Sequence, residues 1–140
     1  MKPWVTQAIL SMVFAGFTSV IAKLGLVGIS GELGLAVRTV FVFVLVMGFA
    51  AVAVPAEQWG GLTRSHYLWL GLSGVTTSLS WIFYYKALKD GEVSTIALID
   101  KASMVVAVLL ASFILKEQLT WRTLVGGSLM LAGLVVMARK

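Results

Sequence analysis

The chain has 140 residues, of which 59% are hydrophobic and only 12% are charged, and its mean hydropathy is +0.98. Soluble domains carry about 25% charged residues, so this composition excludes an ordinary soluble domain and predicts one integral membrane domain over residues 1–140. The net charge of +5 does not indicate nucleic-acid binding, because the basic residues lie scattered near predicted helix ends instead of clustering on one face.

Five apolar segments predict membrane helices at about 4–27, 33–54, 67–87, 95–115 and 121–138. About 20 apolar residues cover the roughly 30 Å hydrocarbon core of a bilayer. The connections are short, so sequential helices are expected to be antiparallel neighbours. The predicted fold is therefore all-α, a five-helix bundle that passes several times through the cell (inner) membrane, with bilayer lipid around it.

The basic residues are almost evenly divided between the two ends of the predicted bundle. With five spans, the side of the N-terminus holds Lys2, Arg64, Lys116 and Arg122, and the other side holds Lys23, Lys86, Lys89, Arg139 and Lys140. Orientation follows the excess of Lys and Arg on the cytoplasmic side, and here there is almost none. This balance predicts insertion in both orientations and an antiparallel homodimer. If Lys23 instead counts as part of its helix, a single topology results.

The pair Asp100 and Lys101 lies inside the apolar segment 95–115. Each charge at the centre of a membrane helix costs about 2.5–3.5 kcal/mol, and such residues often line a solute or ion path. The second and fourth predicted segments both begin on the side of the membrane opposite the N-terminus, and Arg38 lies inside the second. At roughly 1.5 Å per residue, Arg38, Asp100 and Lys101 all lie about 8 Å below the start of their segments. We therefore expect a polar vestibule open to that side.

Aromatic and basic residues at the same end complete this predicted vestibule. Trp81, Tyr84 and Tyr85 offer flat apolar walls with polar edges, and Lys23 lies near the end of the first segment. Asp100 is expected to pair with Arg38 or a lysine. Successive helix residues point about 100° apart, so Lys101 points in a different direction from Asp100 and is expected to face the cavity. The surplus of positive charge favours an anionic or zwitterionic solute.

Each of these residues also has a structural interpretation. Lys23 can extend to the membrane interface, Tyr84 and Tyr85 can form an interfacial aromatic belt, and Arg38 with Asp100 can be a structural pair. His66 is the only histidine and there is no cysteine, so we expect no metal, no cofactor and no enzyme activity.

Three stretches resemble a single EamA-type domain of the drug/metabolite transporter superfamily. They are Phe14–Lys23 with Arg38, then Ser80–Leu88, and finally Ile99–Lys101 with Leu115–Trp121 and the pair Gly126 and Gly127. The resemblance covers essentially the whole chain, which looks like one domain alone and is similar to the short five-helix bacterial and archaeal members, although no single motif is diagnostic.

The resemblance implies half of an inverted-repeat transporter, with a central cavity lined largely by the third and fourth helices and alternating access. Members of this family move diverse solutes, so the resemblance does not name a substrate. Many EamA domains have a proline near the position of Asp100 and Lys101, and this chain has none. It also lacks the membrane glutamate that small multidrug exporters carry in the first helix.

Three functions follow as hypotheses. The first is a secondary transporter of a small polar, anionic or zwitterionic metabolite, with Lys101 and Arg38 binding the negative group, Trp81, Tyr84 and Tyr85 as walls, and Asp100 and Lys23 as coupling or pairing charges. The second is a proton-coupled exporter of organic cations that uses Asp100. The third is a non-transporting membrane subunit assembled through small-residue helix faces.

Overall fold

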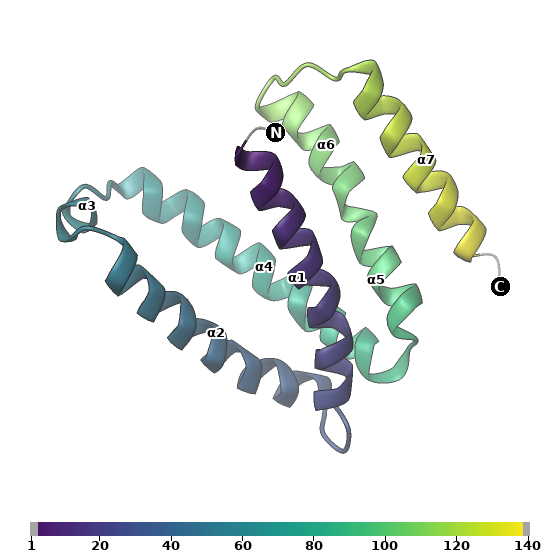
Figure 1. The fold of residues 1–140 in the computed structure, drawn as a ribbon, viewed down its shortest axis with the longest axis horizontal. Coiled ribbons are helices and arrows are strands. Elements are labelled where there is room, and N and C mark those ends of the chain that lie inside the picture. The colour runs from purple at the N-terminus through teal and green to yellow at the C-terminus, as the bar shows by residue number, and fades with distance from the viewer. Residues whose placement is uncertain (1–2, 139–140) are drawn as a thin grey trace. The chain divides into compact units, whose positions relative to one another are not determined.

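The computed structural model describes residues 3–138, all of whose regular elements are helices. The helices are α1 (Pro3–Gly25), α2 (Gly31–Ala53), α3 (Ala56–Gly60), α4 (Arg64–Asp90), α5 (Val93–Lys101), α6 (Ser103–Ile114) and α7 (Trp121–Ala138) (Figure 1). They form two compact units, Met1–Asp90 and Gly91–Lys140. The positions Lys2, Arg139 and Lys140 of the charge count lie outside the described residues.

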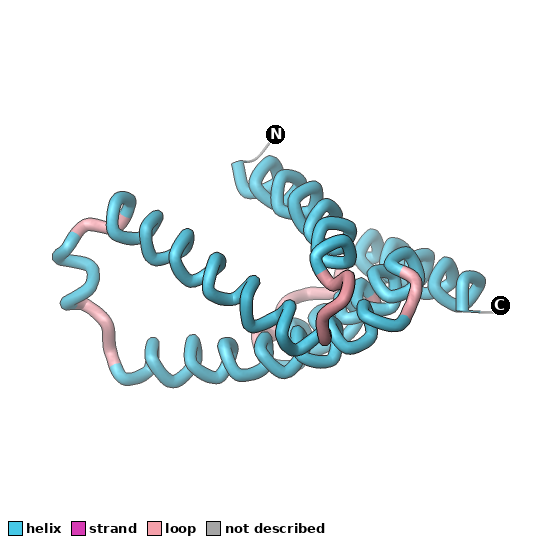
Figure 2. The backbone as a smooth tube through the Cα atoms, turned by 90° about the horizontal axis from the view of Figure 1, so that it is seen from below, coloured by secondary structure: helices cyan, strands magenta, loops and turns pink. Residues whose placement is uncertain are grey.

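In the first unit, α2 and α4 form an antiparallel pair joined through the short helix α3. The two helices converge where α2 begins and α4 ends (Figures 1 and 2). Gly31 permits this approach, because a Cβ at that position would lie 2.6 Å from the carbonyl oxygen of Tyr85. The Ser30 side chain accepts a hydrogen bond from the N–H of Leu33 at 3.2 Å and so caps the start of α2.

Local sequence also explains where the other helices of this unit end. Val54 precedes Pro55 and adopts an extended conformation, which closes α2 as expected for a residue before proline. Gly28 has a φ of 77° in the turn after α1, a conformation that glycine adopts without a steric penalty. The small core of the unit lies at this turn, where Leu26, Tyr85 and Leu88 are buried.

The second unit contains the predicted segment 95–115, which the structure divides into α5 and α6 at Ala102. The N–H of Ala102 bonds to the carbonyl of Ile99, and that of Val105 bonds to the carbonyl of Ala102, each at 3.0 Å. These are the tighter bonds of a 3₁₀ turn, which interrupt the α-helical ladder without a proline. The helix therefore breaks directly after Asp100 and Lys101, and α7 then returns antiparallel (Figure 1).

Within residues 3–138, three stretches are long and apolar enough to cross a membrane, namely α1, α2 and Val93–Ile114. Their large apolar side chains are mostly exposed on all sides, as expected of helices that face lipid. α7 is a shorter apolar helix, and α4 has 27 residues but is more polar. In α4, the hydroxyls of Thr77 and Ser78 bond to backbone carbonyls one turn back, at 2.8 and 2.9 Å. The count of five spans stays a prediction.

Candidate functional site

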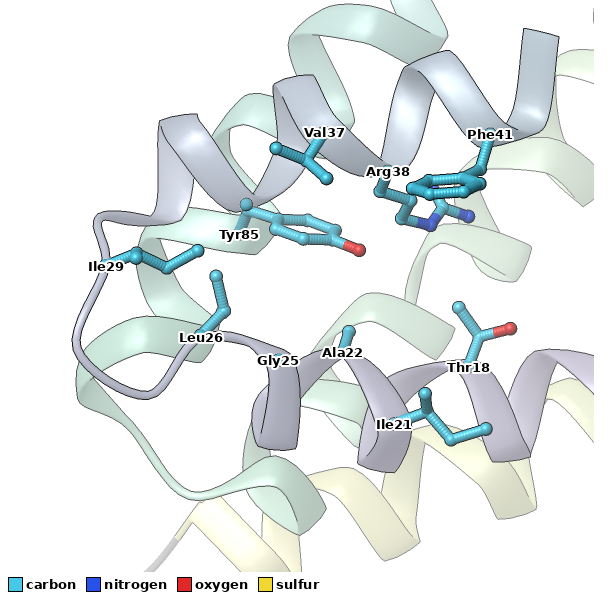
Figure 3. A pocket seen from close by; sticks show the side chains of 11 residues that line it. Thr18, Ile21, Ala22, Gly25, Leu26, Ile29, Val37, Arg38, Phe41 and Tyr85 are labelled. Carbon is cyan, nitrogen blue, oxygen red and sulfur yellow. The ribbon is translucent and has the colours of Figure 1, made fainter. Parts of the chain in front are cut away.

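A cavity of about 460 Å³ lies within the first unit. Its walls come from α1, the turn after it, α2 and one residue of α4 (Figure 3). Its volume falls within the roughly 300–1,000 Å³ that is typical of small-molecule sites. The lining residues are mostly apolar: Thr18, Ile21, Ala22, Gly25, Leu26, Ile29, Gly34, Val37, Arg38, Phe41 and Tyr85.

Arg38 supplies the only formal charge among these lining residues. Its guanidinium carbon lies 4.3 Å from the centroid of the Trp81 ring and 5.8 Å from that of Tyr85. Trp81 and Tyr85 are four residues apart, so both rings lie on one face of α4. Aromatic faces attract a cation most strongly where water is excluded, so these two rings stabilise the guanidinium beside the cavity.

The positive charge of Arg38 is not neutralised within the described part of the chain. Its Nη1 atom is buried and has no hydrogen-bond partner there. Lys86 pairs with Glu32 and Lys101 pairs with Asp100, and neither acidic residue contacts Arg38 within the described residues. A buried donor without a partner costs free energy, which an anion bound at the guanidinium would recover.

Tyr84 and Tyr85 are neighbours in sequence, but they lie in different surroundings. The Tyr85 ring is 4% exposed and forms a wall of the cavity. The Tyr84 hydroxyl instead donates a hydrogen bond to the Oγ of Ser19 at 2.8 Å and so links α4 to α1. The two rings meet edge to face, with centroids 6.2 Å apart. Tyr84 therefore joins α4 to α1 and does not line the cavity.

Lys23 joins α1 to the end of α4. Its Nζ donates hydrogen bonds to the carbonyls of Leu88 at 2.6 Å and Lys89 at 2.9 Å. These carbonyls belong to the last turn of α4. Carbonyl oxygens in the last turn have no hydrogen-bond partner inside their own helix and carry partial negative charge. Lys89 makes the reciprocal contact, because its Nζ donates to the carbonyl of Leu26 at 2.9 Å. The contacts of Lys23 indicate a helix cap that joins two helices.

Asp100 and Lys101 belong to the second unit, where they pair with each other. The Lys101 Nζ lies 3.2 Å from Oδ2 of Asp100, although the two residues start from different faces of α5. The long lysine side chain bends back to the carboxylate at the last turn of that helix. The pair satisfies Asp100 locally, and a pairing of Arg38 with Asp100 stays a prediction.

Several cavity residues were not predicted from the sequence. On α1 they include Thr18, Ala22 and Gly25, and on α2 they include Phe41. A spacing pattern was present in the sequence. Gly34, Val37, Arg38 and Phe41 recur at intervals of three and four residues, which places them on one face of a helix.

The membrane-length apolar helices indicate a multi-pass membrane protein, and its first unit holds a cavity of solute size. It belongs to the EamA-like transporter family, whose sequence profile matches residues 2–139. A curated relative from Sinorhizobium sp. is described as "Uncharacterized transporter in cobO 3'region". It is 32% identical over 140 residues, covering 98% of this chain and 97% of the relative. No solved structure matches.

These findings confirm the family resemblance, and they place the protein in the cell membrane as a membrane transporter. Membership in a transporter family also supports a function other than catalysis.

Proposed function

We propose that this protein is a secondary transporter of a small anionic or zwitterionic metabolite. The observation that carries the proposal is the Arg38 guanidinium, which lies at a solute-sized cavity, is held by the Trp81 and Tyr85 rings and has no acidic partner among the described residues. A guanidinium binds carboxylates and phosphates through paired hydrogen bonds. Arg38 is therefore the proposed contact for the negative group of the solute, with the two rings as its support.

The unit Gly91–Lys140 contributes the second proposed cation, Lys101. Its ion pair with Asp100 must open before the lysine meets an anion or the carboxylate exchanges a proton. The alternative of a cation exporter based on Asp100 needs the same pair to open, because a free carboxylate would be needed to attract a cation. Asp100→Asn is expected to leave binding of an anionic solute in place, whereas it would abolish export of organic cations.

Replacing Arg38 with glutamine tests the proposed solute contact. Purified protein in liposomes would be screened for uptake and counterflow of labelled amino acids and small carboxylates, and the best substrate would be compared across variants. We expect Arg38→Gln to lower transport at least about tenfold, since charged hydrogen bonds contribute roughly 1.5–3 kcal/mol. Arg64→Gln is the matched control, because Arg64 lies at the start of α4 and does not line the cavity.

Equal transport by the Arg38→Gln and Arg64→Gln variants would overturn the proposed role of Arg38. A chain that carries none of these solutes, and that no solute of the panel stabilises, would favour the hypothesis of a non-transporting subunit.

The proposed assembly is an antiparallel homodimer that works by alternating access. It is supported by the near-equal distribution of Lys and Arg between the two predicted sides. The chain has no cysteine, so single cysteines can be placed at Trp59 in α3 and at Asp90 at the end of α4. With a membrane-impermeant maleimide on intact cells, we expect partial labelling at both positions. Complete labelling at one and none at the other would exclude two coexisting orientations.

A further inference from the structure

We infer that the cavity of the first unit takes an amphipathic monocarboxylate, with its carboxylate at Arg38 and its apolar chain between α1 and α2. This inference rests on the proposed transport function and names the substrate class of the same site. It follows from the uneven distribution of polar groups along the cavity and from the identity of the groups at each end.

The polar groups of the lining gather at one end of the cavity. Figure 3 shows the Tyr85 hydroxyl directed toward the end that holds Arg38, Phe41 and Thr18. The guanidinium can donate charged hydrogen bonds to a carboxylate, and the phenolic hydroxyl can donate a further hydrogen bond to the same carboxylate. This end therefore suits one compact anionic group with its oxygen atoms facing a planar cation.

Thr18 does not add a hydrogen-bond partner to this end. Its hydroxyl donates to the carbonyl of Phe14 at 2.9 Å and is directed along α1 in Figure 3, with its methyl group toward the cavity. The lining also has no acidic residue that could bind an ammonium group. The polar end therefore offers the donors of Arg38 and Tyr85, which suit a carboxylate.

The other end of the cavity is apolar and has small residues in one wall. Leu26 is 3% exposed, and Ile29 and Val37 face the same space (Figure 3). Ala22 and Gly25 on α1 leave room there, because neither fills space beyond its own backbone and a methyl group. A hydrated, fully polar solute would lose its water against these groups without replacement, which disfavours small polyanions.

Binding to the full-length protein in lipid nanodiscs tests the inference. One series of probes is alanine, 2-aminobutyrate, norvaline and norleucine, and a second is the matching series of acids without the amino group. We expect affinity to rise about three- to fourfold with each added methylene until the apolar end is filled. We expect 1-aminopentane, which lacks the carboxylate, not to bind.

Ala22→Leu supplies the structural half of the test. The larger side chain fills the apolar end, so we expect norleucine to lose at least about tenfold in affinity while alanine binds as before. Ala51→Leu on the exposed part of α2 adds the same side chain away from the cavity and is the matched control. The two probe series on the unchanged protein test the inference even if the Ala22→Leu variant does not fold.

The outcomes separate this inference from the function on which it rests. If Arg38→Gln removes anion binding but affinity is flat along both series, the transporter of anions stands and the amphipathic substrate class is excluded. If Arg38→Gln leaves carboxylate binding unchanged, the proposed function itself fails.

Discussion

The Gly31→Ala variant is expected to unfold at lower denaturant than the parent protein, with a loss of about 1–3 kcal/mol in the free energy of unfolding. The added Cβ would lie 2.6 Å from the carbonyl oxygen and 2.8 Å from the carbonyl carbon of Tyr85. Both atoms belong to the backbone of α4, so neither can turn away as a side chain could. Relief requires α2 to move away from α4, and the measurement is unfolding by sodium dodecyl sulfate in detergent micelles.

The same movement would disturb the cavity. Arg38 follows Gly31 by two helical turns on α2, while the Trp81 and Tyr85 rings that hold its guanidinium are on α4. We therefore expect Gly31→Ala to weaken solute binding as well as stability. Normal binding by a variant that unfolds early would show that the clash is relieved without displacing Arg38 from the two rings.

Two other glycines of α2 provide graded controls. A Cβ at Gly48 meets no atom within 4 Å, so Gly48→Ala should stabilise the helix by about 0.5–1 kcal/mol. A Cβ at Gly34 would meet the side chain of Leu26, which can change its rotamer, so Gly34→Ala should fall between the other two. If all three variants unfold alike, close backbone approach is not what holds α2 against α4.

The depth of charged and aromatic residues along each helix could be predicted from the sequence. Arg38, Trp81 and Tyr85 lie together as a depth argument suggests, because a rise of about 1.5 Å per residue fixes position along an axis. Rotation about that axis was harder to predict. Tyr84 and Tyr85 are consecutive, so their side chains differ by about 100° in direction. Tyr85 lines the cavity, whereas Tyr84 makes a hydrogen bond between helices.

Irregular backbone was the least predictable feature. The break between α5 and α6 lies at Ala102, a strong helix former, with no proline or glycine beside it to indicate an interruption. Lys116 adopts a φ of 56° after α6, where glycine would be expected. Such choices depend on the packing around the chain, whereas the intrinsic propensities of these residues favour an unbroken helix. The family profile is what supports the overall class, independently of these details.

The second large effect is expected for Lys23→Met. Methionine keeps much of the apolar stem but removes the ammonium that bonds the carbonyls of Leu88 and Lys89 at 2.6 and 2.9 Å. Hydrogen bonds to charged groups contribute roughly 1.5–3 kcal/mol, so we expect a loss of about 2 kcal/mol in the same unfolding measurement. Solute affinity should change less than stability, because Lys23 does not line the cavity.

Lys86→Met is the matched control, since it removes the same charge from the end of α4. Lys86 pairs with Glu32 at 3.3 Å, but both side chains are more than half exposed, and exposed ion pairs contribute about 0–1 kcal/mol. A large loss for Lys23→Met beside a small one for Lys86→Met would show that the burial and the carbonyl partners of Lys23 matter, and not the charge alone. Equal losses would contradict the capping role. If the capping role is confirmed, the two lysines together join α1 and the turn after it to the end of α4, because Lys89 also donates to the carbonyl of Leu26.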